Sequence, residues 1–263
     1  MGILDKWTSG SAYDLWMGRW SRLLAEQFLL WLDVRPGLRW LDVCCGGGIV
    51  TEAVGQRCSP ASVKSIDASP QQIAFARRHR QRQGVAFQLG DAMHLPFPDA
   101  SFDVAVCGLG LNFIPEPDRA LREMRRVTVP GGVVAAYVCD YAEGARFLRE
   151  FWNAAVEIDP AARGLDQASP FPLCTAVAMP ALFEKTGFRH VRYHALEIVT
   201  RFENFADYWT PLLNGQGSAP SYVSTLADSI RNAIRDRLRA SLATDSRGVI
   251  ELPAKARAVR GLN

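Results

Sequence analysis

The sequence predicts an α/β fold built around a largely parallel β-sheet, and two observations carry this prediction. Short apolar stretches alternate with segments of helical periodicity from about residue 21 to residue 139, and each apolar stretch ends in polar or small residues. Alternation of this length is typical of βαβ units with right-handed crossovers. A glycine run, Gly46–Gly48, follows the first apolar stretch. In open α/β sheets the carboxyl edge of the strands binds ligands, so we expect a ligand site there.

The first half of the chain divides into elements with clear boundaries. A helix is expected over 21–34 because its apolar residues recur at helical spacing and Pro36-Gly37 ends it. Ser69 is expected to cap a helix that begins at Pro70 and runs to about Gln83, with Gln72 completing a capping box. A further helix is expected to begin at Ile49. The strands expected in this half cover 38–43, 62–67, 85–89 and 104–107.

The second half begins with the same alternation, which then weakens beyond Asp140. A helix over 117–129, a turn at Pro130–Gly132 and a buried strand over 133–139 are expected first. The weaker region is expected to contain helices at 180–187, 202–213 and 221–244, strands at 190–198 and 249–259, and a flexible loop at 213–220. Pro253 would place the last strand at an edge or at a bulge.

Composition narrows the class of protein. The chain has 263 residues, is 48% hydrophobic and 22% charged, and carries a formal net charge of +3. This length suits one large domain, and the charge is too small to indicate nucleic acid or an anionic membrane as a partner. No apolar run is long enough for a membrane span, which favours a cytoplasmic protein. The six cysteines match no zinc or redox spacing, so we expect no metal.

The glycine loop indicates a nucleotide-like ligand held against bare backbone. Asp67 ends the second strand about 20 residues past Gly48, where an acidic side chain accepts hydrogen bonds from ribose hydroxyls. A simpler alternative is that Asp67 caps the following helix. We favour the ribose role because Ser69 already fills the cap.

Four segments in order carry a resemblance to a known family: 41–48, 65–70, 90–103 and 122–132. They are similar to the S-adenosylmethionine-dependent methyltransferases with a Rossmann-like fold, and within these to the ubiquinone and menaquinone C-methyltransferase branch. The resemblance implies a doubly wound seven-stranded sheet of order 3-2-1-4-5-7-6, with strand 7 antiparallel and a helical insertion between strands 6 and 7. It implies one domain, 1–263, divided into an N-terminal helical cover (1–35), a cofactor-binding core (36–140) and substrate-side helices with the last two strands (141–263).

The resemblance also implies roles for individual residues toward S-adenosylmethionine. Asp42 would face the methionyl ammonium, Asp67 the ribose, and Asp91 with the backbone of Ala92 the adenine. The wider set implied to line the cofactor comprises Tyr13, Arg19, Cys44, Gly46, Gly48, Ala68, Gln72, Cys107, Gly108 and Leu109. For Tyr13 and Arg19, simple packing into the core is an equal alternative, and Asp91 could instead bond its own turn.

One residue departs from the family pattern. Cys44 occupies the first glycine position of the loop, and a side chain there is strained if the backbone needs a positive φ.

Catalysis is harder to locate, because methyl transfer needs alignment and exclusion of water more than a fixed set of catalytic groups. His94 is the first candidate base, with Tyr141 behind it, and an ordinary loop histidine is the alternative for His94. The predicted acceptor is a small molecule, aromatic or prenylated, methylated on O, N or C. No motif of the DNA base methyltransferases is present.

The predicted function is S-adenosylmethionine-dependent methyl transfer, and two alternatives remain beside it. A noncatalytic binding protein of the same fold is suggested by Cys44. A nicotinamide-dependent oxidoreductase is disfavoured, because the loop cannot be aligned with Gly-x-Gly-x-x-Gly.

Overall fold

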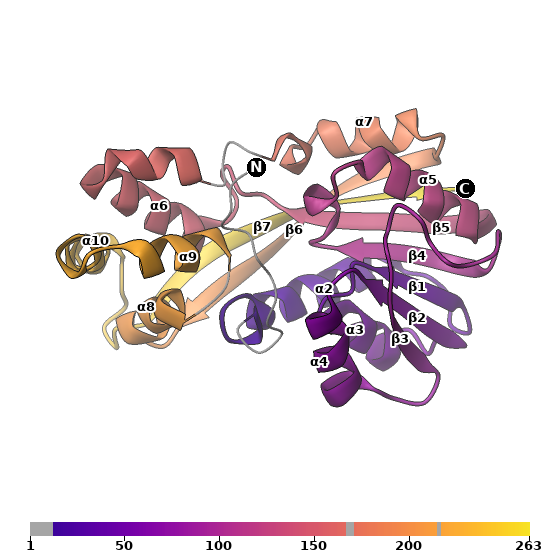
Figure 1. Cartoon of the computed structure of the whole chain (residues 1–263), viewed down its shortest axis with the longest axis horizontal. Helices are drawn as coiled ribbons and strands as arrows, with labels where there is room; N and C mark the ends of the chain where they lie inside the picture. The colour runs from indigo at the N-terminus through magenta and orange to yellow at the C-terminus, as the bar shows by residue number, and fades with distance from the viewer. Residues whose placement is uncertain (1–12, 167–170, 215–216) are drawn as a thin grey trace. The chain divides into compact units, whose positions relative to one another are not determined.

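The computed structural model describes residues 13–166, 171–214 and 217–263, which contain a seven-stranded sheet (Figure 1). The strand order is β3-β2-β1-β4-β5-β7-β6, as predicted. Strands β1 to β5 pair in parallel, and β7 runs antiparallel to β5. The strands are β1 (Arg39–Val43), β2 (Ser62–Asp67), β3 (Val85–Leu89), β4 (Phe102–Gly108), β5 (Thr128–Cys139), β6 (Arg189–Phe202) and β7 (Ile250–Leu262).

The α-helices fall largely where the periodicity placed them. They are α2 (Arg19–Leu32), α3 (Ile49–Arg57), α4 (Pro70–Arg80), α5 (Pro117–Val127), α6 (Arg146–Ile158), α7 (Ala178–Lys185), α8 (Phe205–Asn214), α9 (Ser218–Thr225) and α10 (Asp228–Ser241). Ser69 caps α4 as expected, since its Oγ accepts a hydrogen bond of 3.3 Å from the backbone N–H of Gln72. Within the described ranges, no helix combines the length and the apolar character that crossing a bilayer requires.

The chain divides into two compact units. The larger unit comprises Ser21–Cys139, Pro172–Leu196 and Ala256–Asn263. In it α4 packs on β2 and β3, α5 packs on β4 and β5, and α7 packs on α5. The chain adds β2 and β3 on one side of β1 and adds β4 and β5 on the other, and its crossovers are right-handed. Helices α3 and α4 therefore lie on one face of these strands, and α5 and α7 lie on the other (Figure 1). Apolar strand residues fill the space between the faces and are fully buried, among them Leu41, Val104 and Val134.

The smaller unit comprises the described parts of Met1–Trp20, Asp140–Phe171 and Glu197–Lys255. Its helices α6, α8, α9 and α10 pack around aromatic side chains. Trp16 meets Phe147 and Tyr208 edge to face, and the Tyr208 hydroxyl donates to the backbone oxygen of Phe147 at 2.7 Å. Such pairs stabilise beyond the area that they bury, so the sparse sequence signal of this region still yields a defined core.

The structure corrects three expectations about elements. Strand β5 begins at Thr128 rather than Val133, because the expected turn at Pro130–Gly132 is a bulge that shifts the register against β4. The helix expected over 221–244 is two helices, since Ala227 takes an extended conformation before α10. Helix α6 was not expected at all, and three helices rather than two lie between β6 and β7.

Candidate active site

The loop after β1 turns sharply through a run of positive φ angles. Cys44 has φ of 57°, Gly46 of 50° and Gly48 of 90°. The backbone N–H of Gly48 donates to the oxygen of Cys45 at 2.8 Å, which closes the turn one residue before α3 begins. A Cβ on Gly48 would lie 2.9 Å from the Phe87 ring, so no larger residue fits. The loop therefore exposes bare backbone at the start of a helix, which favours binding of polar ligand groups.

Asp67 ties this loop to the end of β2. One carboxylate oxygen accepts from the backbone N–H of Gly46 at 2.8 Å, and the other accepts from the N–H of Ser69 at 2.9 Å. Partial burial raises the pKa of Asp67, and these two hydrogen bonds pull it back down. Each carboxylate oxygen keeps a second lone pair that can accept from a ligand hydroxyl. The hydrogen bond from Ser69 shows that Asp67 also contacts the start of α4, which was the alternative role for this residue. It leaves lone pairs of Asp67 available for ribose hydroxyls.

Asp42 lies in a dry environment near the end of β1. The Thr51 hydroxyl donates to one of its oxygens at 2.6 Å and shares a further hydrogen bond of 2.8 Å with Ser65. The other oxygen, Oδ1, is buried and has no hydrogen-bond partner among the described residues. Burial is the largest cause that raises the pKa of Asp42, to about 7. A buried carboxylate of this kind is stabilised by a proton or by a nearby cation.

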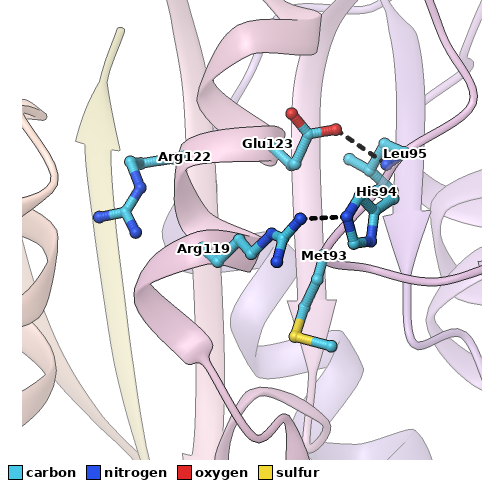
Figure 2. A pocket seen from close by; sticks show the side chains of 6 residues that line it. All are labelled: Met93, His94, Leu95, Arg119, Arg122 and Glu123. Atoms are coloured by element: carbon cyan, nitrogen blue, oxygen red, sulfur yellow. Dashed lines mark hydrogen bonds between the residues drawn. The ribbon is translucent and has the colours of Figure 1, made fainter.

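The end of β3 carries Asp91 and His94 on an exposed turn. One Asp91 oxygen accepts from the N–H of Met93 at 2.8 Å, and this bond is the main cause that lowers the pKa of Asp91. The other oxygen lies 3.2 Å from Nδ1 of His94. Arg119 donates to Nε2 of His94 (Figure 2). Both ring nitrogens are therefore engaged, and a base role for His94, which stays a prediction, requires Arg119 to release Nε2.

A hollow of about 310 Å³ lies beside this turn (Figure 2). It opens between the segment that follows Asp91 and the first turns of α5. The lining residues are Met93, His94, Leu95, Arg119, Arg122 and Glu123.

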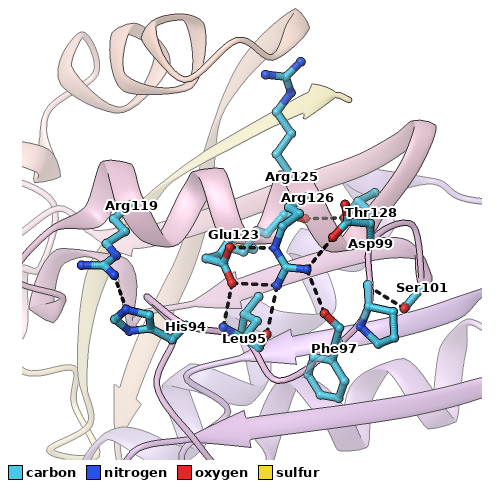
Figure 3. A network of polar contacts seen from close by, with 12 residues as sticks. His94, Leu95, Phe97, Asp99, Ser101, Arg119, Glu123, Arg125, Arg126 and Thr128 are labelled. Atoms are coloured by element: carbon cyan, nitrogen blue, oxygen red, sulfur yellow. Dashed lines mark hydrogen bonds and ion pairs between the residues drawn. The ribbon is translucent and has the colours of Figure 1, made fainter.

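Arg126 fastens the same segment to α5 (Figure 3). Its guanidinium pairs with both oxygens of Glu123 at 2.8 Å, and it donates to the backbone oxygens of Leu95 at 3.0 Å and Phe97 at 2.9 Å. Glu123 in turn accepts from the N–H of Leu95 at 2.8 Å. A fork of donors that is paired in this way is rigid, so the residues after Asp91 and Ala92 are held in place. Sequence reasoning missed this role, although the spacing of Glu123 and Arg126 on one helix face could have indicated the pair.

The end of β4 is closely packed. A Cβ on Gly108 would lie 2.6 Å from a methyl carbon of Val50 and 2.9 Å from the Tyr137 hydroxyl, so the glycine is required. Leu109 turns away with φ of 57°, and its N–H donates to the oxygen of Tyr137 at 2.8 Å. Cys107 is fully buried.

The Cys44 side chain is accommodated by Gly110, which lies just beyond the end of the neighbouring strand β4. Its side chain hydrogen-bonds that of Cys107, and this bond with burial raises the pKa of the Cys44 thiol. A Cβ on Gly110 would lie only 2.5 Å from the Cβ of Cys44. The chain thus carries a side chain at the first loop position and a glycine opposite it. The positive φ shows that Cys44 does take the strained conformation that the sequence raised as a concern.

Asn112 was not singled out from the sequence. It lies in a short 3-10 helix, Leu111–Phe113, directly after the β4 exit. Both polar atoms of its side chain are buried, and neither has a hydrogen-bond partner among the described residues.

The predicted residues divide between the two units. The larger unit contains most of them: Asp42, Cys44, Gly46, Gly48, Asp67, Ala68, Gln72, Asp91, Ala92, His94, Cys107, Gly108 and Leu109. They lie at or just beyond the carboxyl ends of β1 to β4, with Ala68 exposed and Gln72 buried in the first turn of α4.

Tyr13, Arg19 and Tyr141 belong to the smaller unit. Nη1 of Arg19 lies 3.1 Å from both carboxylate oxygens of Asp207, and its guanidinium stacks on the Trp20 ring at 4.2 Å. Its Nε and Nη2 are buried without a partner in the described part of the chain. Tyr141 is buried beside Phe171, with ring centroids 5.2 Å apart. Their roles toward a cofactor or substrate stay predictions.

The described part of the chain holds no group of three His, Cys, Asp or Glu side chains arranged for an ion.

Comparison with known proteins places these features in a family. The family described as "Methyltransferase domain" matches residues 41–136. A curated demethylmenaquinone methyltransferase of Bacillus licheniformis is 31% identical over 177 residues, which cover 62% of this chain and 75% of the relative. The matched residues 41–136 contain the ends of β1 to β4 and the whole Arg126 network.

Solved structures agree on the fold. One chain of the complex that contains the Haloferax volcanii Trm112 methyltransferase activator superposes with a TM-score of 0.62 at 18% identity, covering 99% of both chains. The Haemonchus contortus phosphoethanolamine N-methyltransferase 2, solved with S-adenosyl-L-methionine, superposes with a TM-score of 0.59 at 15% identity. That match covers 96% of this chain and 56% of the other.

Proposed function

This chain belongs to the S-adenosylmethionine-dependent methyltransferase family and uses S-adenosylmethionine as its cofactor, and from this premise we propose that it methylates a small aromatic acceptor. The observation that supports the cofactor site in this proposal is the hydrogen bond of 2.8 Å from the Gly46 N–H to Asp67, which joins the β1 loop to the β2 carboxylate. A nucleoside with a charged amino acid tail needs a site of this kind, with polar groups at two neighbouring strand ends.

The residues present fit this cofactor. Oδ1 of Asp42 is buried without a partner among the described residues, and the pKa of its carboxyl is raised to about 7, so a cation beside it would relieve the cost of burial. The φ of 90° and the Phe87 ring, 2.9 Å from where a Cβ would lie, both require glycine at position 48, so the loop presents bare backbone there. We assign Asp42 to the methionyl ammonium, Asp67 to the ribose hydroxyls, and Asp91 with Ala92 to the adenine.

The chain's own residues supply alignment rather than covalent chemistry. The cofactor supplies an activated methyl group on a positively charged sulfur. Gly108 keeps the β4 exit free of a side chain, and the packing around the fully buried Cys107 excludes water. The methyl group would pass to the acceptor atom while Asp42, Asp67 and Asp91 hold the cofactor in place. A proton leaves the acceptor, for which His94 and Tyr141 are the candidate bases.

We propose a reduced naphthoquinone ring as the acceptor and a ring carbon as the methylated atom. The demethylmenaquinone methyltransferase relative supports this acceptor. A hydroquinone ring is nucleophilic at the carbon next to a hydroxyl-bearing carbon, whereas the oxidised quinone is electrophilic and does not attack a sulfonium methyl group.

The test is an anaerobic transfer assay with methyl-labelled S-adenosylmethionine and 2-geranyl-1,4-naphthohydroquinone, a short-chain demethylmenaquinol. We expect labelled product with the new methyl group on the ring carbon, formed one for one with S-adenosylhomocysteine. The oxidised quinone and an Asp67→Ala variant are the controls, and both should give far less product. Saturable binding of S-adenosylmethionine without transfer to the hydroquinone would contradict the proposed acceptor.

A further inference from the structure

The Asn112 side chain stands out among the buried polar groups. Both its Oδ1 and its Nδ2 are buried and unpaired within the ranges that the structure describes. The unpaired atoms of Trp40 and Trp152 are single donors and that of Ser218 is one hydroxyl, whereas Asn112 leaves an amide oxygen and an amide nitrogen unsatisfied together. Each such unpaired group destabilises the fold, so an unpaired amide in a native structure calls for an explanation.

The backbone around Asn112 is held by hydrogen bonds on both sides. The N–H of Phe113 donates to the oxygen of Gly110 at 3.0 Å, and the N–H of Ile114 donates to the oxygen of Leu111 at 3.3 Å. The short helix packs on β5 and on α5, and Leu111 is fully buried. Asn112 therefore sits on a rigid support four residues past Gly108, at the strand exit where the proposed function places the acceptor.

An amide matches the oxygen of a phenol in either protonation state. Its Oδ1 accepts from a neutral hydroxyl, and its Nδ2 donates to the oxyanion that remains after the proton leaves. A site built to hydrogen-bond a substrate hydroxyl discriminates strongly against analogues that lack it, because its own polar groups are then left unpaired.

We propose that Asn112 is the residue that positions the acceptor, by hydrogen-bonding the ring oxygen next to the methylated carbon. The proposal rests on the proposed function and makes it more specific, because it requires an acceptor with a hydroxyl group on the carbon adjacent to the nucleophilic one.

The test uses two probes and two variants. The probes are 2-geranyl-1,4-naphthohydroquinone and its 4-O-methyl ether, which lacks the hydroxyl next to the acceptor carbon. The variants are Asn112→Leu, which replaces the amide by an apolar group of similar size, and Asn112→Asp, which keeps the shape. Asn153→Leu, at an exposed amide on α6, is the matched control.

We expect kcat/KM for the hydroquinone to fall about ten- to a hundredfold in Asn112→Leu, the range for loss of one strong hydrogen bond. The Kd for S-adenosylmethionine should stay within twofold, and Tm should not fall, because an unpaired buried amide is being replaced by an apolar group. The wild type should have a higher kcat/KM for the hydroquinone than for its ether. In Asn112→Leu this ratio should decrease toward the value that the rings alone determine. Asn112→Asp should lose activity with the deprotonated acceptor, because its carboxylate repels the oxyanion, and its Tm should fall, because a carboxylate buried without a partner is destabilising.

The outcomes separate this inference from the proposed function. An active wild type with Asn112 variants within threefold of it, or with an unchanged preference between the probes, overturns the role of Asn112 and leaves the function standing. A fall in Tm and in cofactor affinity in both variants, with the probe preference retained, shows a structural role and also overturns it. A wild type that binds S-adenosylmethionine but methylates neither probe overturns the proposed acceptor and this inference with it.

Discussion

The polar side chains at the ends of β2 and β4 differ in their hydrogen bonding. At the end of β2 the Asp67 carboxylate is held by two backbone N–H groups, 2.8 and 2.9 Å away, before any ligand arrives. Just past the end of β4 the Asn112 amide is buried with no partner in the described ranges. The first arrangement stabilises the fold and the ligand site together, whereas the second leaves a cost that a ligand relieves.

This difference separates the two halves of the reaction. The cofactor side is organised by hydrogen bonds between strand ends, so damage there should lower stability and cofactor affinity together. The acceptor side contributes little to stability, so damage there should lower turnover alone. Each prediction below tests one part of this contrast.

The largest effect is expected for Gly48→Ala. The residue has φ of 90°, and an added Cβ would lie 2.9 Å from the Phe87 ring. Left-handed strain and overpacking together should lower the free energy of unfolding by about 2–4 kcal/mol. Urea denaturation measures this loss.

Gly55→Ala is the matched control for Gly48→Ala. Gly55 lies within α3, and nothing lies within 4 Å of its added Cβ. The control should be neutral or more stable by about 0.5–1 kcal/mol, because alanine favours a helix. Equal losses in the two variants would show that the β1 loop does not need its left-handed glycine.

Asp67→Ala should lower both stability and affinity. Removal of the carboxylate frees the N–H groups of Gly46 and Ser69 and takes away the proposed ribose acceptor. We expect the Kd for S-adenosylmethionine to rise about ten- to a hundredfold, with a fall in Tm. Calorimetric titration and thermal unfolding measure the two effects. A change in Tm alone would mean that Asp67 is a purely structural residue.

Affinity for S-adenosylmethionine should depend on pH through Asp42. Its folded pKa of about 7 lies above the ordinary value of 3.8, so the folded protein holds a proton that the unfolded chain has lost. The apoprotein should therefore become less stable as pH rises from about 4 to 7. A cation binds best to the ionised carboxylate, so affinity should fall about tenfold from pH 8 to pH 6. Titrations at several pH values in wild type and Asp42→Asn should show this dependence only in the wild type.

The smallest effect is expected at Cys44. Its φ of 57° is unfavourable for any residue with a Cβ. Cys44→Gly should raise the free energy of unfolding by about 1 kcal/mol, since glycine adopts this conformation without strain. Cys44→Ala keeps the strain and should give no gain. A loss of stability in Cys44→Gly would show that the contact of its thiol with Cys107 outweighs the strain.

The cofactor half of the molecule could be predicted from the sequence because its signals are local. Strands β2 and β3 begin and end where the apolar runs do, and Ser69 caps α4 as the residue types require. Asp67 and Gly48 are recognised by their distance along the chain from the first strand.

The rest depends on contacts between residues that are distant in sequence. The orphaned amide of Asn112 becomes visible only when the surroundings of the β4 exit are known, and Arg126 reaches Leu95 from 31 residues away. The break between α9 and α10 also escapes sequence patterns, because Leu226 and Ala227 are ordinary helix formers. Tertiary packing determines these features. Periodicity alone therefore predicts one long helix over 221–244.

The most direct measurement is a calorimetric titration of S-adenosylmethionine and its demethylated product into the purified wild-type protein. We expect saturable binding of one molecule per chain, with a dissociation constant in the micromolar range, on the order of ten- to a hundredfold tighter than in Asp67→Ala. No heat of binding at millimolar ligand, with a folded protein, would contradict a cofactor site at the ends of β1 and β2.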